Sequence, residues 1–185
     1  MAIGNPFNIG ATPFGPNDAI FGFNGSANLL KYFHANGMMQ WSIPARGVGS
    51  SADFGRNGNT PPGIYELLNP VEIHAHDSKA KALGPLFVPL EPFVVPYVNH
   101  FNRDNLGIHG GGSDLPNPLA TKQGWETTLG CIRLQNGDLR NFVSAVQMHK
   151  TKGFRAWITV RWFETDAVTK AMKPVPWAPP TPKTF

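Results

Sequence analysis

Two residues with complementary chemistry, a histidine and the chain's only cysteine, lie in the segment from Gly107 to Leu134. His109 precedes three glycines, and Cys131 directly follows Gly130. A thiol becomes a nucleophile when a base within hydrogen-bond reach takes its proton, and backbone N–H groups can stabilise the oxyanion that its attack generates. Gly130 would let the chain turn tightly and point successive amides inward. Although a lone cysteine is more often a small buried apolar residue, this combination favours a cysteine nucleophile with a histidine base.

A second group of residues, His74 and His76, has a spacing that metal sites use. On a strand, residues i and i+2 face the same side, so the two imidazoles could bind zinc with a third ligand such as His100 or Asp104. No HExxH or similar motif accompanies them, and histidines on the surface of a loop are the simpler interpretation. The single cysteine excludes an internal disulfide and a multi-cysteine zinc knuckle.

Short strands and one helix are expected to position these residues. The chain has 185 residues, which fits one domain, and its 20 glycines and 18 prolines favour strands, turns and shaped loops over a helical bundle. Two apolar runs flank Asn36-Gly37, a dipeptide typical of hairpin turns, so a hairpin is expected within residues 27–47. The other expected elements are strands at Ile64–Leu68, Leu106–His109 and Arg155–Phe163, and an amphipathic helix that begins at the N-cap Asp138 and buries Leu139, Phe142, Val143 and Val146.

Five prolines lie between Asn69 and Asn105, interleaved with valine and phenylalanine. Proline cannot donate a hydrogen bond to a sheet ladder, so this composition allows only brief edge strands. We expect a long loop or flap that covers a cleft.

The sequence resembles the catalytic domains of the L,D-transpeptidase (YkuD-like) family. The family signature is a histidine at a strand end followed by a small residue, a variable loop, and then Ser/Thr-His-Gly-Cys-x-Arg/Asn. Here Ile108-His109-Gly110 resembles the first half, and Thr128-Leu129-Gly130-Cys131-Ile132-Arg133 resembles the second. Upstream, Thr60-Pro61-Pro62-Gly63-Ile64-Tyr65 is similar to the family's Thr-Pro-x-Gly before an aromatic strand. The resemblance covers Ala27 to Val146.

This resemblance implies a fold, and together with the composition of the two ends it suggests a division of the chain. The fold is mainly β with one or two helices (α+β), a YkuD-like β-sandwich with a long Pro-rich capping loop. Residues 1–26 would form an irregular N-terminal arm, residues 27–165 the L,D-transpeptidase-like catalytic domain, and residues 166–185 a Pro-rich C-terminal tail.

The resemblance also implies a reaction on peptidoglycan. Cys131 would attack the carbonyl of the meso-diaminopimelate residue in a tetrapeptide stem, releasing D-alanine and leaving a thioester. His109 would take the thiol proton, oriented by the carbonyl of Gly110. Attack on the thioester by an amine gives a cross-link or an exchanged D-amino acid, and attack by water gives a shortened stem. The implied chemistry uses no metal or other cofactor.

Further residues of the motif would bind the substrate. The amides of Leu129, Gly130 and Cys131 would form the oxyanion hole, within a turn that begins at Thr128. Arg133 would orient the motif or hold a substrate carboxylate, because a guanidinium offers that anion a bidentate fork. Trp125 would line the substrate groove.

One departure from the signature bears on the activity. Leu129 stands where the family has a histidine two positions before the cysteine, whereas the usual base matches His109. This departure leaves open a catalytically degenerate module that only binds peptidoglycan, beside the third alternative of a zinc-dependent wall peptidase using His74 and His76. Cysteine wall hydrolases of the NlpC/P60 type place the cysteine before the histidine, so the order of residues here disfavours that class.

Charge and the first residues suggest where the protein works. The net charge is +4 and the basic residues are scattered, so a nucleic-acid footprint is weakly supported, and the surface would equally suit any polyanion, including a bacterial wall. No apolar stretch approaches the ~20 residues that span a bilayer, and the start lacks the features of a signal peptide. The chain is similar to divergent family members that are delivered into rival bacteria by type VI secretion. That similarity implies an antibacterial toxin made in the cytoplasm and acting in the periplasm or wall of a target bacterium, with an immunity protein and a secretion-machine component as partners.

Overall fold

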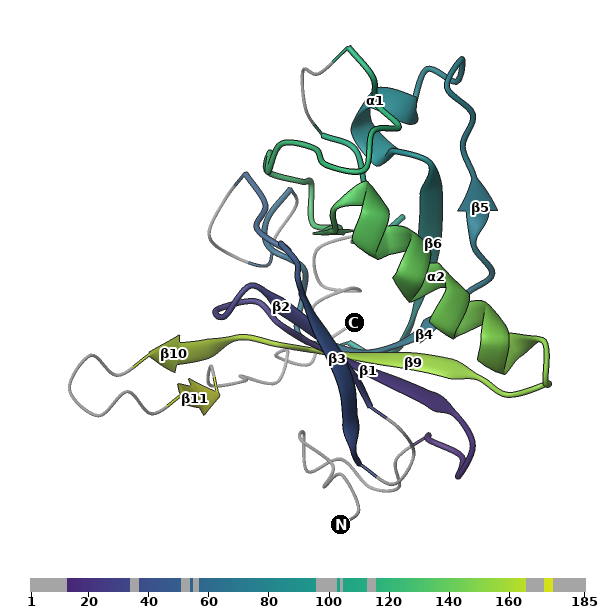
Figure 1. The fold of residues 1–185 in the computed structure, drawn as a ribbon. Helices are drawn as coiled ribbons and strands as arrows, with labels where there is room; N and C mark the ends of the chain where they lie inside the picture. The colour runs from purple at the N-terminus through teal and green to yellow at the C-terminus, as the bar shows by residue number, and fades with distance from the viewer. Residues whose placement is uncertain are drawn as a thin grey trace, which may run out of the picture.

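The computed structural model describes residues 13–33, 37–50, 54, 57–95, 103, 105–112, 116–165 and 172–174. Their backbone forms a curled sheet with a long helix packed against it (Figure 1). In chain order the elements are β1 (Ala19–Asn24), β2 (Leu29–Phe33), β3 (Met39–Pro44), β4 (Gly63–Leu67), β5 (Val71–Glu72), α1 (Ala80–Leu83), β6 (Leu86–Val94), β7 (Gly107–His109), β8 (Ile132–Arg133), α2 (Asn136–Lys150), β9 (Ala156–Arg161), β10 (Phe163–Thr165) and β11 (Met172–Pro174).

The middle of the sheet is built from strands that lie far apart in the sequence. The strand order is β3-β2-β1-β9-β4-β6-β7-β8, with β5 paired to β6. β9 runs parallel to β1 and antiparallel to β4, so Ile158 lies between Phe21 and Tyr65. Because β9 is covered on both faces, five of its six residues are buried, which explains its nearly continuous apolar sequence.

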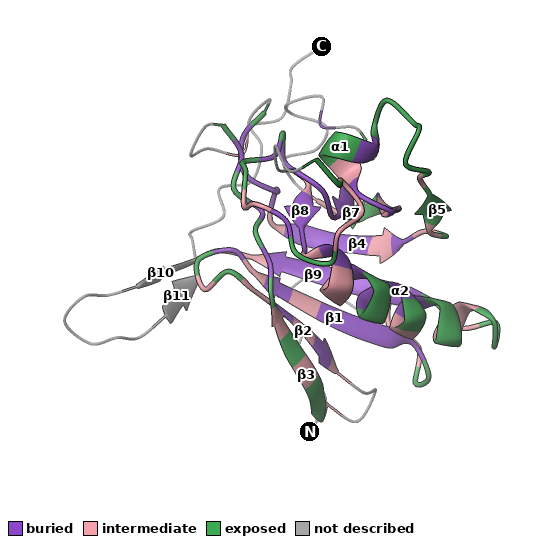
Figure 2. Ribbon diagram, turned by 45° about the horizontal axis from the view of Figure 1, so that its top comes forward, coloured by how far each residue is buried: buried purple, intermediate pink, exposed green. Residues whose placement is uncertain are grey.

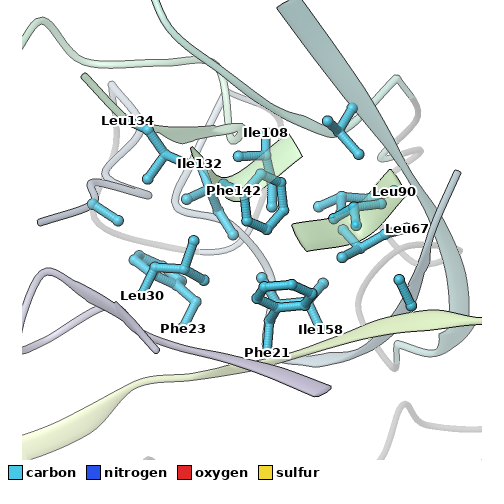
Figure 3. Close-up of a cluster of buried hydrophobic side chains, with 14 of the residues drawn as sticks. Phe21, Phe23, Leu30, Leu67, Leu90, Ile108, Ile132, Leu134, Phe142 and Ile158 are labelled. Atoms are coloured by element: carbon cyan, nitrogen blue, oxygen red, sulfur yellow. The ribbon is translucent and has the colours of Figure 1, made fainter. Parts of the chain in front are cut away.

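The two halves of the curled sheet face each other across one hydrophobic core. Figure 3 shows Ile108, Ile132 and Leu134 on one side and Phe21 on the other, with Phe142 between them. All five side chains are fully buried. This core fixes the position of β7 and β8, the strands that carry the two chemically interesting residues.

Helix α2 supplies Phe142 to this core and begins earlier than the sequence suggested. It buries the four expected apolar residues, and Phe142 meets Phe21 edge-on with ring centroids 4.9 Å apart. Its N-cap is Gln135, so the prediction of Asp138 as N-cap is wrong. Asp138 instead lies in the first turn, where its negative charge complements the helix dipole.

The Pro-rich region is only partly a loop. β6 has nine residues and lies between β4 and β7, so the expectation of brief edge strands alone is wrong there. Pro89 accepts a hydrogen bond from Leu68 through its carbonyl, and Pro92 lies beside the register shift between Ile64 and Tyr65. A proline at such an irregularity leaves the rest of the ladder intact. Residues 96–102 and 104 lie outside the described residues.

Both ends of the chain contribute more regular structure than expected. β1 lies within the range assigned to an irregular arm, yet it is an inner strand of the sheet. Asp18 helps to hold it there, because its carboxylate accepts hydrogen bonds from the Arg155 amide at 3.0 Å and the Trp157 indole at 2.9 Å. β11 lies in the expected tail and pairs with β10. The period-2 pattern missed β1 because its residues are buried on both faces.

The expected fold class and the expected hairpin are confirmed. The fold is mainly β with two helices, and β2 and β3 form the antiparallel hairpin, although its Asn36 lies outside the described residues. In the part of the chain that the structure describes, no helix is long and apolar enough to cross a membrane.

Candidate active site

The pairing of β7 with β8 places His109 and Cys131 on the same face of the sheet. The two strands run parallel, with Ile108 beside Ile132 and His109 beside Arg133. Ile108 and Ile132 point into the core, and side chains alternate along a strand. His109 and Arg133 therefore project to the opposite face. Cys131 directly precedes β8, and the same alternation continued by one residue turns its side chain to this face as a diagonal neighbour of His109. Figure 2 shows both strands buried within the sheet.

Four cross-strand neighbours form a row on this face. Phe87 lies beside His109, His109 beside Arg133, and Arg133 beside Arg46. The last contact joins the segment after β3 to β8 through two backbone hydrogen bonds, from Arg46 N to Arg133 O at 2.9 Å and from Arg133 N to Arg46 O at 2.6 Å. Because β3 and β8 are the two ends of the strand order, this bridge brings the ends of the curled sheet together beside Cys131.

His109 is set up as a neutral base. Its Nδ1 lies 2.7 Å from the carbonyl oxygen of Gly110, as the resemblance implied. A carbonyl can only accept, so Nδ1 carries the proton and Nε2 of the neutral ring has the free lone pair. The pKa of His109 is lowered to about 4, mainly by burial. The Gly110 hydrogen bond raises this pKa, and the positive charge of Arg133 lowers it further. Phe87 contributes to this burial by stacking on the imidazole, with centroids 6.2 Å apart.

Cys131 is set up as a protonated thiol. Burial raises the pKa of Cys131, while a Gly107 backbone hydrogen bond and the charges of Arg103 and Arg133 act in the opposite direction. The Sγ donates weakly to the Asn105 carbonyl at 3.9 Å. A neutral imidazole and a neutral thiol are the resting pair, so the thiolate must form by proton transfer.

The turn before the cysteine is held by one hydroxyl. Thr128 Oγ1 donates to the Cys131 carbonyl at 2.7 Å and accepts from the Gly130 amide at 3.1 Å. Gly130 has φ +110°, which a residue with a side chain rarely adopts. The Gly130 amide is thus occupied by Thr128. The amides of Leu129 and Cys131 have no acceptor among the described residues, so they are the donors available to an oxyanion.

Sequence reasoning missed Arg103, which holds this same turn from the other side. Its Nη2 donates to the carbonyl of Leu129 at 3.3 Å and to those of Gly58 and Asn59 at 3.4 Å. The side chain is buried, and a Cβ on Gly130 would collide with the guanidinium. Nothing in the local sequence marks Arg103, because its partners are backbone carbonyls from distant loops.

Arg133 is a buried anchor for the segment before the turn. Its Nη1 donates to the Glu126 carbonyl at 2.6 Å, and its Nε–H has no acceptor within the described residues. Of the two roles implied for Arg133, orienting the motif agrees better with this burial than holding a substrate carboxylate. The neighbouring residue Trp125 is half-buried, and its carbonyl accepts from Arg46 Nη1 at 2.7 Å.

Leu129 is exposed to solvent, with a relative accessible surface of 67%. Val48, also exposed, lies close by, because its carbonyl accepts the Thr128 amide at 3.0 Å. The position that carries a histidine in the family signature therefore contributes apolar surface at the nucleophile.

The insert between histidine and cysteine is tied to α2 by amides that the sequence analysis did not single out. Asn136, fully buried, accepts the Gly111 amide at 2.9 Å and donates to the carbonyls of Pro118 and Ala120. Gln135 exchanges two hydrogen bonds with the backbone of Gln123. The only sequence signal for this role of Asn136 was its place at the start of a helix, where asparagine is also a preferred N-cap.

The histidines of the zinc hypothesis lie elsewhere. His74 and His76 are exposed on the turn between β5 and α1, with their rings stacked 5.6 Å apart. Within the described part of the chain no group of three possible ligands comes together. His100 and Asp104 lie outside the described residues.

Comparisons with known proteins identify the family that the chain matches and the structures that its fold resembles. The model of the YkuD family, the L,D-transpeptidase catalytic domain, matches residues 20–161. The fold is similar to Bd1075 of Bdellovibrio bacteriovorus, at 14% identity over 86% of this chain and 50% of that chain, with a TM-score of 0.55. It is also similar to the helical cell shape determining protein Pgp2 of Campylobacter jejuni, at 20% identity over 82% of this chain and 49% of that chain, with a TM-score of 0.55.

A third structure, an L,D-transpeptidase from Stackebrandtia nassauensis, is 14% identical over 80% of this chain and 57% of that chain, with a TM-score of 0.51. The chain spans about half the length of these three structures. At such identities the likeness establishes the fold alone. A comparison with curated proteins gave no match.

The resting protonation state predicts the pH dependence of thiol reactivity. Alkylation of Cys131 by iodoacetamide should rise through an apparent pKa above the ordinary thiol value of about 8.5, because burial raises the pKa of Cys131. No step should occur near about pH 6.5, the ordinary histidine value, because the pKa of His109 is about 4. The same protein in urea provides the reference titration. A reactivity plateau at neutral pH would contradict this state and show a thiolate–imidazolium pair.

Arg103 should influence the cysteine directly. Replacing it with methionine removes a positive charge that favours the thiolate, so the apparent pKa of Cys131 should rise and alkylation at a fixed mildly alkaline pH should slow about tenfold. Arg161→Met is the matched control, because Arg161 is also partly desolvated but lies on β9. Arg103→Lys keeps the charge and should keep most of the reactivity. An unchanged titration in a folded Arg103→Met protein would refute the electrostatic role.

Proposed function

Because the chain belongs to the L,D-transpeptidase catalytic domain (YkuD) family, we propose that it is a cysteine acyltransferase that modifies peptidoglycan tetrapeptide stems. The observation that supports the proposal is the β7–β8 register, in which the buried, neutral His109 lies beside Arg133, two residues after Cys131. A neutral imidazole and a thiol can generate a nucleophile at the moment of attack.

The first half-reaction would proceed through a thioester. Nε2 of His109 takes the thiol proton while Sγ of Cys131 attacks the carbonyl carbon of the meso-diaminopimelate residue. The amides of Leu129 and Cys131 donate to the oxyanion. The positive charges of Arg103 and Arg133 stabilise the negative charge that forms on the sulfur of Cys131. Collapse of the tetrahedral intermediate breaks the peptide bond, and the leaving amine of D-alanine takes the proton from His109.

The second half-reaction would return the enzyme to its starting state. An acceptor amine gives a cross-link or an exchanged D-amino acid, and water gives an L,D-carboxypeptidase product. His109 removes a proton from the acceptor and returns it to the sulfur. The side chain of Leu129 cannot donate a hydrogen bond to the acceptor, so product choice is the property that this departure from the signature would affect.

Muropeptide analysis tests the mechanism. Incubation with tetrapeptide-rich peptidoglycan should convert tetrapeptides into shortened, exchanged or cross-linked products detected by mass spectrometry. Cys131→Ala should abolish conversion, and His109→Gln should slow it by about a hundredfold or more, as expected for loss of a general base. Met148→Ala, on an exposed position of α2, is the control. Turnover by Cys131→Ala would refute the thioester, and binding without turnover by the wild type would identify a degenerate module.

We also propose that the protein acts as an antibacterial effector in the periplasm of a target cell. Its support is the resemblance to divergent family members and Leu129 in the signature position. The consumption of tetrapeptide stems would deplete the donors of normal cross-linking and weaken the wall.

Expression in two compartments tests the effector role. Fusion to a secretory signal peptide should make the protein toxic, with swelling or lysis, whereas cytoplasmic expression should be harmless because no peptidoglycan is met there. Toxicity should disappear in Cys131→Ala. A harmless periplasmic form with unchanged muropeptides would refute the proposal, and toxicity that persists without the thiol would indicate another target.

A further inference from the structure

Arg46 lies on the face of the sheet that carries the nucleophile. Its reciprocal hydrogen bonds with Arg133 define an antiparallel pair, and partners in such a pair project to the same side with Cα atoms about 5.5 Å apart. Its neighbour Ala45 is buried in the core, as the alternation requires. Arg46 therefore extends the row of His109 and Arg133 by one place.

The guanidinium of Arg46 is exposed but held in place. Nη1 donates to the Trp125 carbonyl at 2.7 Å, and the guanidinium carbon lies 5.8 Å from the centroid of the Trp125 ring. A cation stacked on an aromatic ring loses less freedom when it binds a ligand. Arg46 forms no ion pair with an acidic residue in the described part of the chain, so its remaining N–H donors face solvent.

The surroundings of Arg46 select an anion with an apolar portion. Arg103 and Arg133 are the positive charges that act on Cys131, but both are buried and donate to backbone carbonyls. Exposed Val48 and Leu129 provide apolar surface beside the same turn. Of the three guanidinium groups, Arg46 is the one that a substrate can reach.

We propose that Arg46 and Trp125 form a carboxylate subsite that docks a free carboxylate of the stem peptide beside the nucleophile. This inference rests on the proposed function and names the substrate feature that the site selects. The guanidinium fork binds the carboxylate through two N–H groups, and the Trp125 ring fixes the plane of the fork. The subsite favours stems with free carboxylates over stems in which these groups are amidated.

Substrate pairs test the subsite during turnover. The wild type should convert a tetrapeptide stem with free side carboxylates at a KM about tenfold below that for its amidated counterpart. This ratio is what the loss of one charge-assisted hydrogen bond typically causes. Arg46→Gln should raise the KM for the free acid to that of the amide and leave kcat nearly unchanged. Arg46→Lys should recover part of the preference. Arg140→Gln, which changes an exposed arginine on α2, is the matched control.

A second measurement needs no turnover. Alkylation rates of Cys131 with maleimidopropionic acid and maleimidopropionamide, and with their hexanoic homologues, compare a carboxylate with a neutral tail. The acid-to-amide rate ratio should be several-fold higher for the wild type than for Arg46→Gln. Equal ratios in the two proteins at both tail lengths would overturn the subsite. If the ratio depends on Arg46 but no stem peptide is converted, the proposed reaction fails while anion capture stands.

Discussion

The parallel pairing of β7 with β8 is the constraint on which the site depends. It joins His109, at the end of one short strand, to the segment that follows Cys131, and it turns both side chains away from the core. Ile108 and Ile132 secure this arrangement, because a slip of one residue would bring His109 and Arg133 into the apolar interior. The burial of Ile108 and Ile132 therefore fixes which side chains of β7 and β8 project to the opposite face.

The histidine of this site has a backbone carbonyl as its partner, and the positively charged side chains around the cysteine turn are arginines. His109 is oriented by a backbone carbonyl, and three arginines lie around the cysteine turn. Two of them, Arg103 and Arg133, are buried and fasten the backbone on either side of Cys131. The same contacts that order the turn also bring positive charge to the place where a thiolate and an oxyanion form.

Local patterns predicted much of this molecule. The His109-Gly110 and Gly130-Cys131 pairs, the β2–β3 hairpin and the apolar face of α2 all follow from interactions between residues close in sequence. β1 and β6 were missed for a physical reason. Strands covered on both faces do not alternate in polarity, and prolines are tolerated where a ladder is already irregular.

The sequence by itself determined which residue types are available for chemistry: one thiol, one histidine before glycines, and a glycine that permits the turn at Gly130. Only the tertiary structure decided which groups surround them. Arg46 pairs with Arg133, two residues after the cysteine, because the sheet curls until its two ends meet. Arg103 acts on the cysteine because distant loops offer carbonyls to its buried guanidinium. Such contacts leave no local pattern, since backbone carbonyls are the same at every position of the chain.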